Sequence, residues 1–177
     1  MADYDTASRA FGCGANHVTH MFNAMNGLHH RDSGIPGAAS DNEKVYVELI
    51  CDGIHLSPSM IRAALKIYGE DRVVAISDSM EACDMPDGEY SLGGQKVIKN
   101  GNAATLTDGT LAGSVTNLYD AFLTLVKNGI SLGTALKLVT INPAKSIGMD
   151  KKVGTLSVGA FADILLMDKD LQLKRIL

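Results

Sequence analysis

Residues 45 to 78, VYVELICDGIHLSPSMIRAALKIYGEDRVVAISD, decide the fold. VYVELICD (45–52) is an almost continuous apolar run, which is typical of a strand buried on both faces. A helix is predicted over 57–69, because a serine N-cap and a proline open this stretch and a glycine closes it. RVVAISD (72–78) is a second buried strand. The order strand, helix, strand predicts a right-handed parallel unit and therefore an α/β protein.

The flanking segments extend this pattern on both sides. Asn-Gly and Asp-Gly pairs between short alternating runs indicate a small antiparallel β element. A Gly-, His- and Ser-rich stretch predicts a long loop with one short helical turn. The predicted elements are a helix at 3–11, a strand at 16–22 (NHVTHMF), the loop at 26–42, the antiparallel element at 84–110, helices at 115–129 and 131–148, and strands and turns at 151–174.

Composition limits the class of protein. The chain has 177 residues, 46% hydrophobic and 20% charged, with a formal net charge of −4, which fits one globular domain. Basic residues form no stripe, so a nucleic-acid partner is not expected. No apolar run approaches the roughly 20 residues of a membrane span, and the acidic start does not resemble a signal peptide, so we expect a cytoplasmic protein without a membrane partner. Cys13, Cys51 and Cys83 are odd in number, widely spaced and without a CxxC pair, so they indicate neither a disulfide framework nor a thiolate zinc site.

Four of the five histidines lie between residues 17 and 34. On a strand, His17 and His20 would point to opposite faces, so one metal ion cannot use both. His20 is the better candidate ligand, because sites in parallel α/β folds lie at the carboxyl ends of strands. We interpret His17 as a surface or packing residue, and His29 and His30 as members of a solvated loop.

Ionisable residues end three successive predicted strands: His20, His55 and Asp78. Such a set at one edge of a parallel sheet is typical of a catalytic rim, and by residue type all three could bind a metal ion. Arg31 is either a clamp for carboxylate or phosphate or an ordinary surface cation. LAGSVTN (111–117) could present backbone N–H groups to an anion, although this signal alone is weak.

Five motifs in this order resemble the N-acetylglucosamine-6-phosphate deacetylases, which are metal-dependent amidohydrolases. The resemblance implies a partial TIM (β/α) barrel with a small β element: residues 1–160 would be the carboxyl-terminal part of the barrel, with a β excursion near 84–110, and 161–177 the truncated start of a terminal β segment. The motifs are THMFNAM (19–25), DGIH (52–55), the Ser-Asp pair at 77–78, LAGS (111–114) and GTLSVGAFADILLMD (154–168).

The resemblance also implies roles for individual residues. Asp78 matches a catalytic aspartate and His20 a metal ligand. His55 matches a residue that contacts the substrate near the scissile amide. The resemblance therefore replaces the interpretation of His55 as a metal ligand. Arg31 matches an arginine that binds phosphate across a dimer interface. The implied substrate-binding residues are Asn23, Ala24, Arg31, His55, Leu111, Ala112 and Gly113.

The implied reaction removes the N-acetyl group of N-acetylglucosamine 6-phosphate, giving glucosamine 6-phosphate and acetate. It uses a divalent metal, with zinc favoured and iron or manganese also compatible. The resembling proteins carry a histidine and a glutamate ligand upstream of Met1, so we expect a truncated chain with weak metal binding. Uncovered strand edges predict self-association, as a dimer. The alternatives are an amidohydrolase of cyclic amides and a non-catalytic remnant that binds sugar phosphate.

Overall fold

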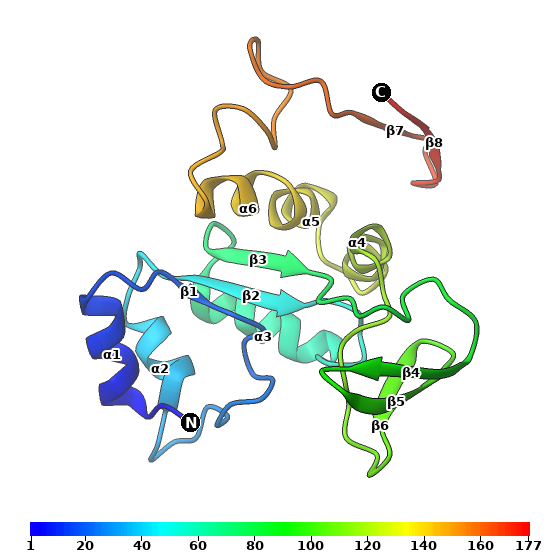
Figure 1. Ribbon diagram of the computed structural model, residues 1–177. Helices are drawn as coiled ribbons and strands as arrows, with labels where there is room; N and C mark the ends of the chain where they lie inside the picture. The colour runs from blue at the N-terminus through cyan, green and yellow to red at the C-terminus, as the bar shows by residue number, and fades with distance from the viewer.

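The computed structural model describes residues 1–177 as a mixed α/β protein with a small β element (Figure 1). The helices are α1 (Tyr4–Gly12), α2 (Gly34–Ser40), α3 (Pro58–Tyr68), α4 (Leu118–Lys127), α5 (Leu132–Val139) and α6 (Ile141–Ser146). The strands are β1 (His17–Val18), β2 (Tyr46–Ile50), β3 (Val73–Ile76), β4 (Gly88–Leu92), β5 (Gln95–Asn100), β6 (Ala103–Leu106), β7 (Leu165–Met167) and β8 (Leu173–Ile176).

The central sheet is parallel, in the order β1-β2-β3. The register pairs Val47 with Val73 and Ile50 with Ile76, so β2 and β3 end level with each other. In Figure 1 the arrowheads of β2 and β3 point to the same side, toward the small antiparallel sheet. The predicted strand, helix, strand unit is therefore confirmed, and it sets the carboxyl ends of these strands at one edge.

One face of this sheet forms the main core. Val47, Leu49, Val73 and Ala75 are almost completely buried and belong to one cluster, whereas Glu48 and Val74, which lie between them on the pleated strands, do not belong to it. Side chains of α3, α4 and α5 belong to the same cluster of nineteen buried residues. Helix α3 begins and ends as predicted: the Ser57 hydroxyl accepts a hydrogen bond from the Met60 amide at 3.3 Å.

The antiparallel element predicted near 84–110 is confirmed. Strands β4, β5 and β6 form a three-stranded antiparallel sheet. Val97 and Ala104 from this sheet pack in a second small core with Met80, Ala82 and Val115. The element is therefore attached to the chain segments that follow β3 and precede α4.

The predicted strand at 16–22 is wrong beyond Val18. The chain turns instead, with positive φ angles at His20 (37°), Phe22 (74°) and Ala24 (50°). Contacts distant in sequence support this backbone, since the Met21 amide donates to the Glu48 carbonyl at 2.7 Å. The alternation of faces that we used to compare His17 with His20 consequently does not reach His20.

Two other boundaries differ from the prediction. The segment at 26–42 contains a helix of seven residues, α2, rather than a single helical turn. The helix predicted at 131–148 is broken at Thr140 into α5 and α6. Pro143 explains the break, because proline lacks an N–H group and its ring collides with the carbonyl four residues earlier.

Asn142 fixes the short helix α6 against the start of β3. Its side chain is completely buried, and Nδ2 donates to the Glu70 carbonyl at 2.6 Å and the Val73 carbonyl at 2.7 Å. Two backbone acceptors from another part of the chain thus depend on one amide group.

The carboxyl-terminal segment is a separate hairpin of β7 and β8, set apart above α4 and α5 in Figure 1. The Tyr119 hydroxyl of α4 donates to the Leu171 carbonyl and accepts a hydrogen bond from the Leu173 amide at 3.1 Å. Leu171 and Met167 also pack against the main core. None of the helices is long and apolar enough to cross a lipid bilayer.

Candidate active site at the carboxyl ends of the parallel strands

The segments that follow β2 and β3 meet residues 111–114 at the edge of the sheet. His55 Nε2 lies 3.0 Å from the Ala112 carbonyl oxygen. The Ser114 amide donates to the Asp78 carbonyl at 2.9 Å, and the Met80 amide donates to the Ser114 carbonyl at 2.8 Å. The structure therefore brings together His55, Asp78 and the predicted loop at 111–113, although they lie far apart in sequence.

Gly113 permits this close approach. A Cβ atom there would lie 3.1 Å from Cβ of Met80 and 3.5 Å from the carbonyl oxygen of Asp78. The first distance is tighter than ordinary van der Waals contact, so any larger residue would push the two segments apart. The absence of a side chain at Gly113 thus lets residues 111–114 lie against the end of β3.

Asp78 presents an exposed carboxylate immediately after β3. Its φ angle is 50°, in the left-handed region that Asp adopts more readily than most residues. The backbone hydrogen bond from Ser114 holds this turn in place. The site therefore offers a carboxylate that faces solvent from a fixed backbone, as a general base requires.

His55 and Asp52 form a buried pair beside it. His55 Nδ1 lies 2.6 Å from Asp52 Oδ2, and the two side chains are only 7% and 2% exposed. The hydrogen bond to Asp52 raises the pKa of His55 more than burial lowers it. Burial raises the pKa of Asp52, but the hydrogen bonds from the His55 ring and from the Ile54 and His55 amides together lower it below its ordinary value.

His20 lies in the turn after β1, with Asn23 and Ala24. Its Nδ1 atom is buried and has no hydrogen-bond partner, which is consistent with a nitrogen that binds a ligand. However, no group of three or more His, Cys, Asp or Glu side chains is arranged to hold a metal ion. A catalytic zinc normally has about three protein ligands. The residues of this chain thus supply one candidate donor and do not form a complete metal centre.

Asn23 and Ala24 are held by the same turn. The Asn23 amide donates to the His20 carbonyl at 2.9 Å, and the Asn23 side chain donates to the Met21 carbonyl at 3.4 Å. Ala24 is exposed. The two residues therefore follow His20 in one tight segment, as the motif THMFNAM places them.

Arg31 makes no hydrogen bond to any of these residues. It is exposed, and its guanidinium donates to His30 Nε2 at 2.7 Å. His29 and Asp32 exchange two backbone hydrogen bonds, which close a tight turn around it. The histidines of this turn are exposed loop residues, as interpreted from the sequence, and Arg31 is their cationic neighbour.

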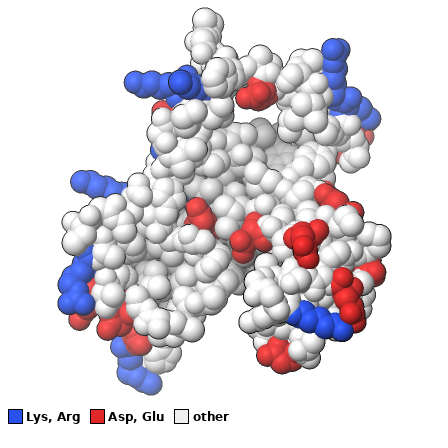
Figure 2. Space-filling model, viewed as in Figure 1, with Lys and Arg blue, Asp and Glu red and all other residues white.

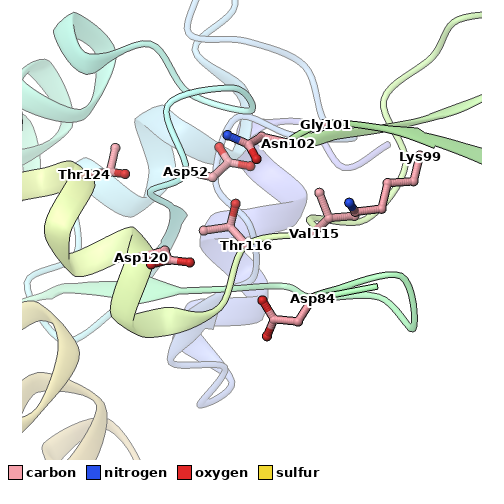
Figure 3. A pocket seen from close by; sticks show the side chains of 9 residues that line it. All are labelled: Asp52, Asp84, Lys99, Gly101, Asn102, Val115, Thr116, Asp120 and Thr124. Atoms are coloured by element: carbon pink, nitrogen blue, oxygen red, sulfur yellow. The ribbon is translucent and has the colours of Figure 1, made fainter. Parts of the chain in front are cut away.

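A small polar pocket of about 220 Å³ lies beside Asp52 (Figure 3). Asp52 lines it together with Asp84, Lys99, Gly101, Asn102, Val115, Thr116, Asp120 and Thr124. Figure 2 shows acidic side chains across the middle of the viewed face and around β4–β6, with Lys and Arg mostly at the margins. An anionic ligand on this face would therefore depend on individual cations and N–H groups.

Asp52 is the site residue to which the sequence reasoning gave no role. Its signal was present, because an aspartate at the end of a buried strand with a histidine three residues later can form a closed turn.

The parallel sheet and the residues gathered at its edge define an α/β protein with a polar site at the carboxyl ends of parallel strands. Residues 2–176 match the amidohydrolase family, and the chain belongs to that family.

Curated relatives carry related names. An N-acetylgalactosamine-6-phosphate deacetylase of Escherichia coli O157:H7 is 33% identical over 99% of this chain and 46% of its own length. An N-acetylglucosamine-6-phosphate deacetylase of Bacillus subtilis is 36% identical over 96% of this chain and 43% of its own. The chain thus spans less than half the length of these relatives. A putative N-acetylgalactosamine-6-phosphate deacetylase of Escherichia coli K12 is 34% identical to this chain. The match covers 89% of this chain and 94% of that relative's own length.

Solved structures agree with this placement. An N-acetylglucosamine-6-phosphate deacetylase from Pasteurella multocida superposes with a TM-score of 0.94 at 29% identity, over 99% of this chain and 46% of that one. A D267A mutant of the deacetylase from Mycobacterium smegmatis, in complex with N-acetyl-D-glucosamine-6-phosphate, gives 0.93 at 32% identity, over 99% of this chain and 47% of that one.

Proposed function

We propose that this chain forms the substrate-orienting part of a deacetylase that hydrolyses the N-acetyl group of N-acetylglucosamine 6-phosphate. The observation that carries the proposal is the hydrogen bond from His55 Nε2 to the Ala112 carbonyl, at 3.0 Å. A backbone carbonyl and an N-acetyl carbonyl are both amide oxygens. The His55 N–H group is therefore directed at the kind of acceptor that the substrate would bring.

Asp78 is the general base and acid of the proposed reaction. Its exposed carboxylate takes a proton from the attacking water molecule and gives it to the departing amine, so that acetate and the free amino sugar are released. The His55 N–H group stabilises the negative charge that develops on the carbonyl oxygen. Leu111, Ala112 and Gly113 form the wall beside the acetamido group, and Ala112 must yield its hydrogen bond when substrate binds.

The sugar phosphate is assigned to Asn23, Ala24 and Arg31. A guanidinium binds a phosphate with two parallel N–H donors, and Arg31 is exposed and held in a closed turn. Its exposure leaves the guanidinium free to act across a dimer interface, so the phosphate site would be completed by a second copy. Exposed apolar side chains, such as Leu156, Val158 and Phe161, are consistent with such self-association.

A divalent metal, with zinc favoured over iron or manganese, accompanies this activity in the proposal, and His20 is the residue that would contact it. The parallel strands belong to a partial TIM (β/α) barrel, with residues 161–177 starting a terminal β segment. Three consecutive parallel strands joined through helices support the barrel. Because the chain offers one candidate donor, metal binding by the isolated chain should be weak, with a millimolar Kd by calorimetry.

A second candidate substrate is N-acetylgalactosamine 6-phosphate. It is favoured by the names of two relatives, one of which has nearly the length of this chain. The two sugars are epimers and share both the acetamido group and the phosphate, so the roles of His55, Asp78 and Arg31 apply to either. The preference for one of the two sugars depends on contacts to the single ring hydroxyl at which they differ.

The test measures acetate release and calorimetric binding for both sugar phosphates, with unphosphorylated N-acetylglucosamine as the control. The expected result is binding that requires the phosphate, with stronger binding or turnover for one epimer. Asp78→Asn should abolish any turnover while it preserves binding. Equal binding of the unphosphorylated sugar would contradict the assigned substrate class, and binding of an unphosphorylated cyclic amide instead would favour another amidohydrolase.

A further inference from the structure

The buried carboxylate of Asp52 divides its two oxygens between two tasks. Oδ1 accepts hydrogen bonds from the amides of Ile54 and His55, each at 2.8 Å. Oδ2 lies 2.6 Å from Nδ1 of the His55 ring. One oxygen therefore closes the turn that follows β2, and the other holds the imidazole within that turn.

Both nitrogens of the His55 ring face atoms that only accept hydrogen bonds. Nδ1 faces the Asp52 carboxylate, and Nε2 faces the Ala112 carbonyl oxygen. A neutral imidazole carries one N–H group and could donate to one of them, whereas the imidazolium donates to both. The titratable groups that act on this ring are Asp52 in its own turn and Asp78 after β3, and both favour the charged form.

The pair is also shielded from water. With the two side chains 7% and 2% exposed, little solvent competes for the Nδ1 hydrogen bond or screens the charges. A ring hydrogen-bonded on both sides cannot flip without breaking both bonds. The direction of the Nε2–H bond is consequently set by Asp52, which itself forms no hydrogen bond with Ala112 or Asp78.

We propose that Asp52 is a positioning residue, which keeps His55 protonated on both nitrogens and directs its Nε2–H group toward the acyl oxygen of the substrate. This inference rests on the proposed function for the identity of that oxygen. The state of the ring itself is a property of the free chain. A cationic donor stabilises a developing oxyanion more strongly than a neutral one does, since its hydrogen bond is charge-assisted.

The variant Asp52→Asn isolates this role. An asparagine keeps Oδ1 for the two turn amides and replaces Oδ2 with an NH₂ group, which donates and cannot accept. The His55 ring must then lose its Nδ1 proton to receive that donor, while Nε2–H still reaches Ala112. Asp84→Asn is the matched control, because Asp84 lines the same pocket (Figure 3) and is not a hydrogen-bond partner of the His55 ring.

The measurement is ¹⁵N NMR of the imidazole nitrogens, recorded on the free chain between pH 5 and 9. In the wild type and in Asp84→Asn, both His55 nitrogens should be protonated at neutral pH. In Asp52→Asn, the titration midpoint should move to lower pH, and Nε2–H should be the protonated position of the neutral ring. A neutral His55 ring in the wild type, or an unchanged titration in Asp52→Asn, would overturn the proposal.

Two features keep this test decisive. The wild-type spectrum tests the doubly protonated ring even if Asp52→Asn fails to fold. No substrate is present, so failure of the deacetylase assignment leaves the NMR result intact, and failure of the Asp52 role leaves phosphate-dependent binding intact. If both proposals hold, Asp52→Asn should lower kcat with little change in KM, because the acyl oxygen gains its charge only in the transition state.

Discussion

Replacing Asn142 with alanine tests how strongly helix α6 depends on one buried amide. The side chain is completely buried, and its Nδ2 group donates to the Glu70 carbonyl and the Val73 carbonyl. Loss of the bond to Glu70, in a partly buried position, costs about 0.5–1.5 kcal/mol. The Val73 acceptor is buried, so loss of its donor costs about 1–3 kcal/mol.

The same change removes the Oδ1 atom of Asn142, a buried acceptor without a partner, which offsets part of this loss. We therefore expect Asn142→Ala to lower the free energy of unfolding by about 1.5–3 kcal/mol. Urea unfolding followed by circular dichroism measures this as a lower midpoint at unchanged slope. Asn102→Ala, at an exposed residue, is the control and should stay within about 0.5 kcal/mol. Equal midpoints for the two variants would refute the reasoning.

Two further predictions concern charge. Arg31→Ala should weaken binding of the phosphorylated amino sugar by about 1.5–3 kcal/mol and leave the unphosphorylated sugar unaffected, which calorimetry would measure; equal losses for both sugars would contradict the phosphate assignment. The raised pKa of His55 predicts a stabilisation that is complete below the unfolded value of about 6.5 and is lost as pH rises through the folded value. The lowered pKa of Asp52 predicts a stabilisation present above about 3.9 and lost as pH falls through the folded value. The difference in unfolding free energy between wild type and His55→Gln should therefore be largest between about pH 3.9 and about pH 6.5. If urea titrations gave the same difference at every pH, the assigned pKa shifts would be contradicted.

The parts of the fold that the sequence predicts are those with local signals. The strand, helix, strand unit at 45–78 carries its own caps and apolar runs, and the structure reproduces it. The strand predicted at 16–22 failed because composition favoured β structure, whereas contacts with β2 hold that segment in a turn. The left-handed backbone conformation at His20 and Phe22 is stabilised by those distant contacts, and no local sequence pattern predicts it.

The candidate site also contains contacts that the local sequence predicts and contacts that it does not predict. The placement of His55 and Asp78 at neighbouring strand ends follows from the parallel unit, and local spacing brings Asp52 to His55. The contact between His55 and Ala112 joins residues 57 positions apart, and spacing alone cannot predict it. The roles assigned to these residues, and to His20 and Arg31, stay predictions that the experiments above test.

The hairpin of β7 and β8 is attached to the rest of the chain by few interactions. It shares no strand ladder with the parallel sheet, and Tyr119 and a few apolar contacts attach it to the core. We therefore expect its opening to cost less free energy than unfolding of the sheet. On this expectation, the carboxyl-terminal residues should detach and rejoin while the pair of Asp52 and His55 stays assembled.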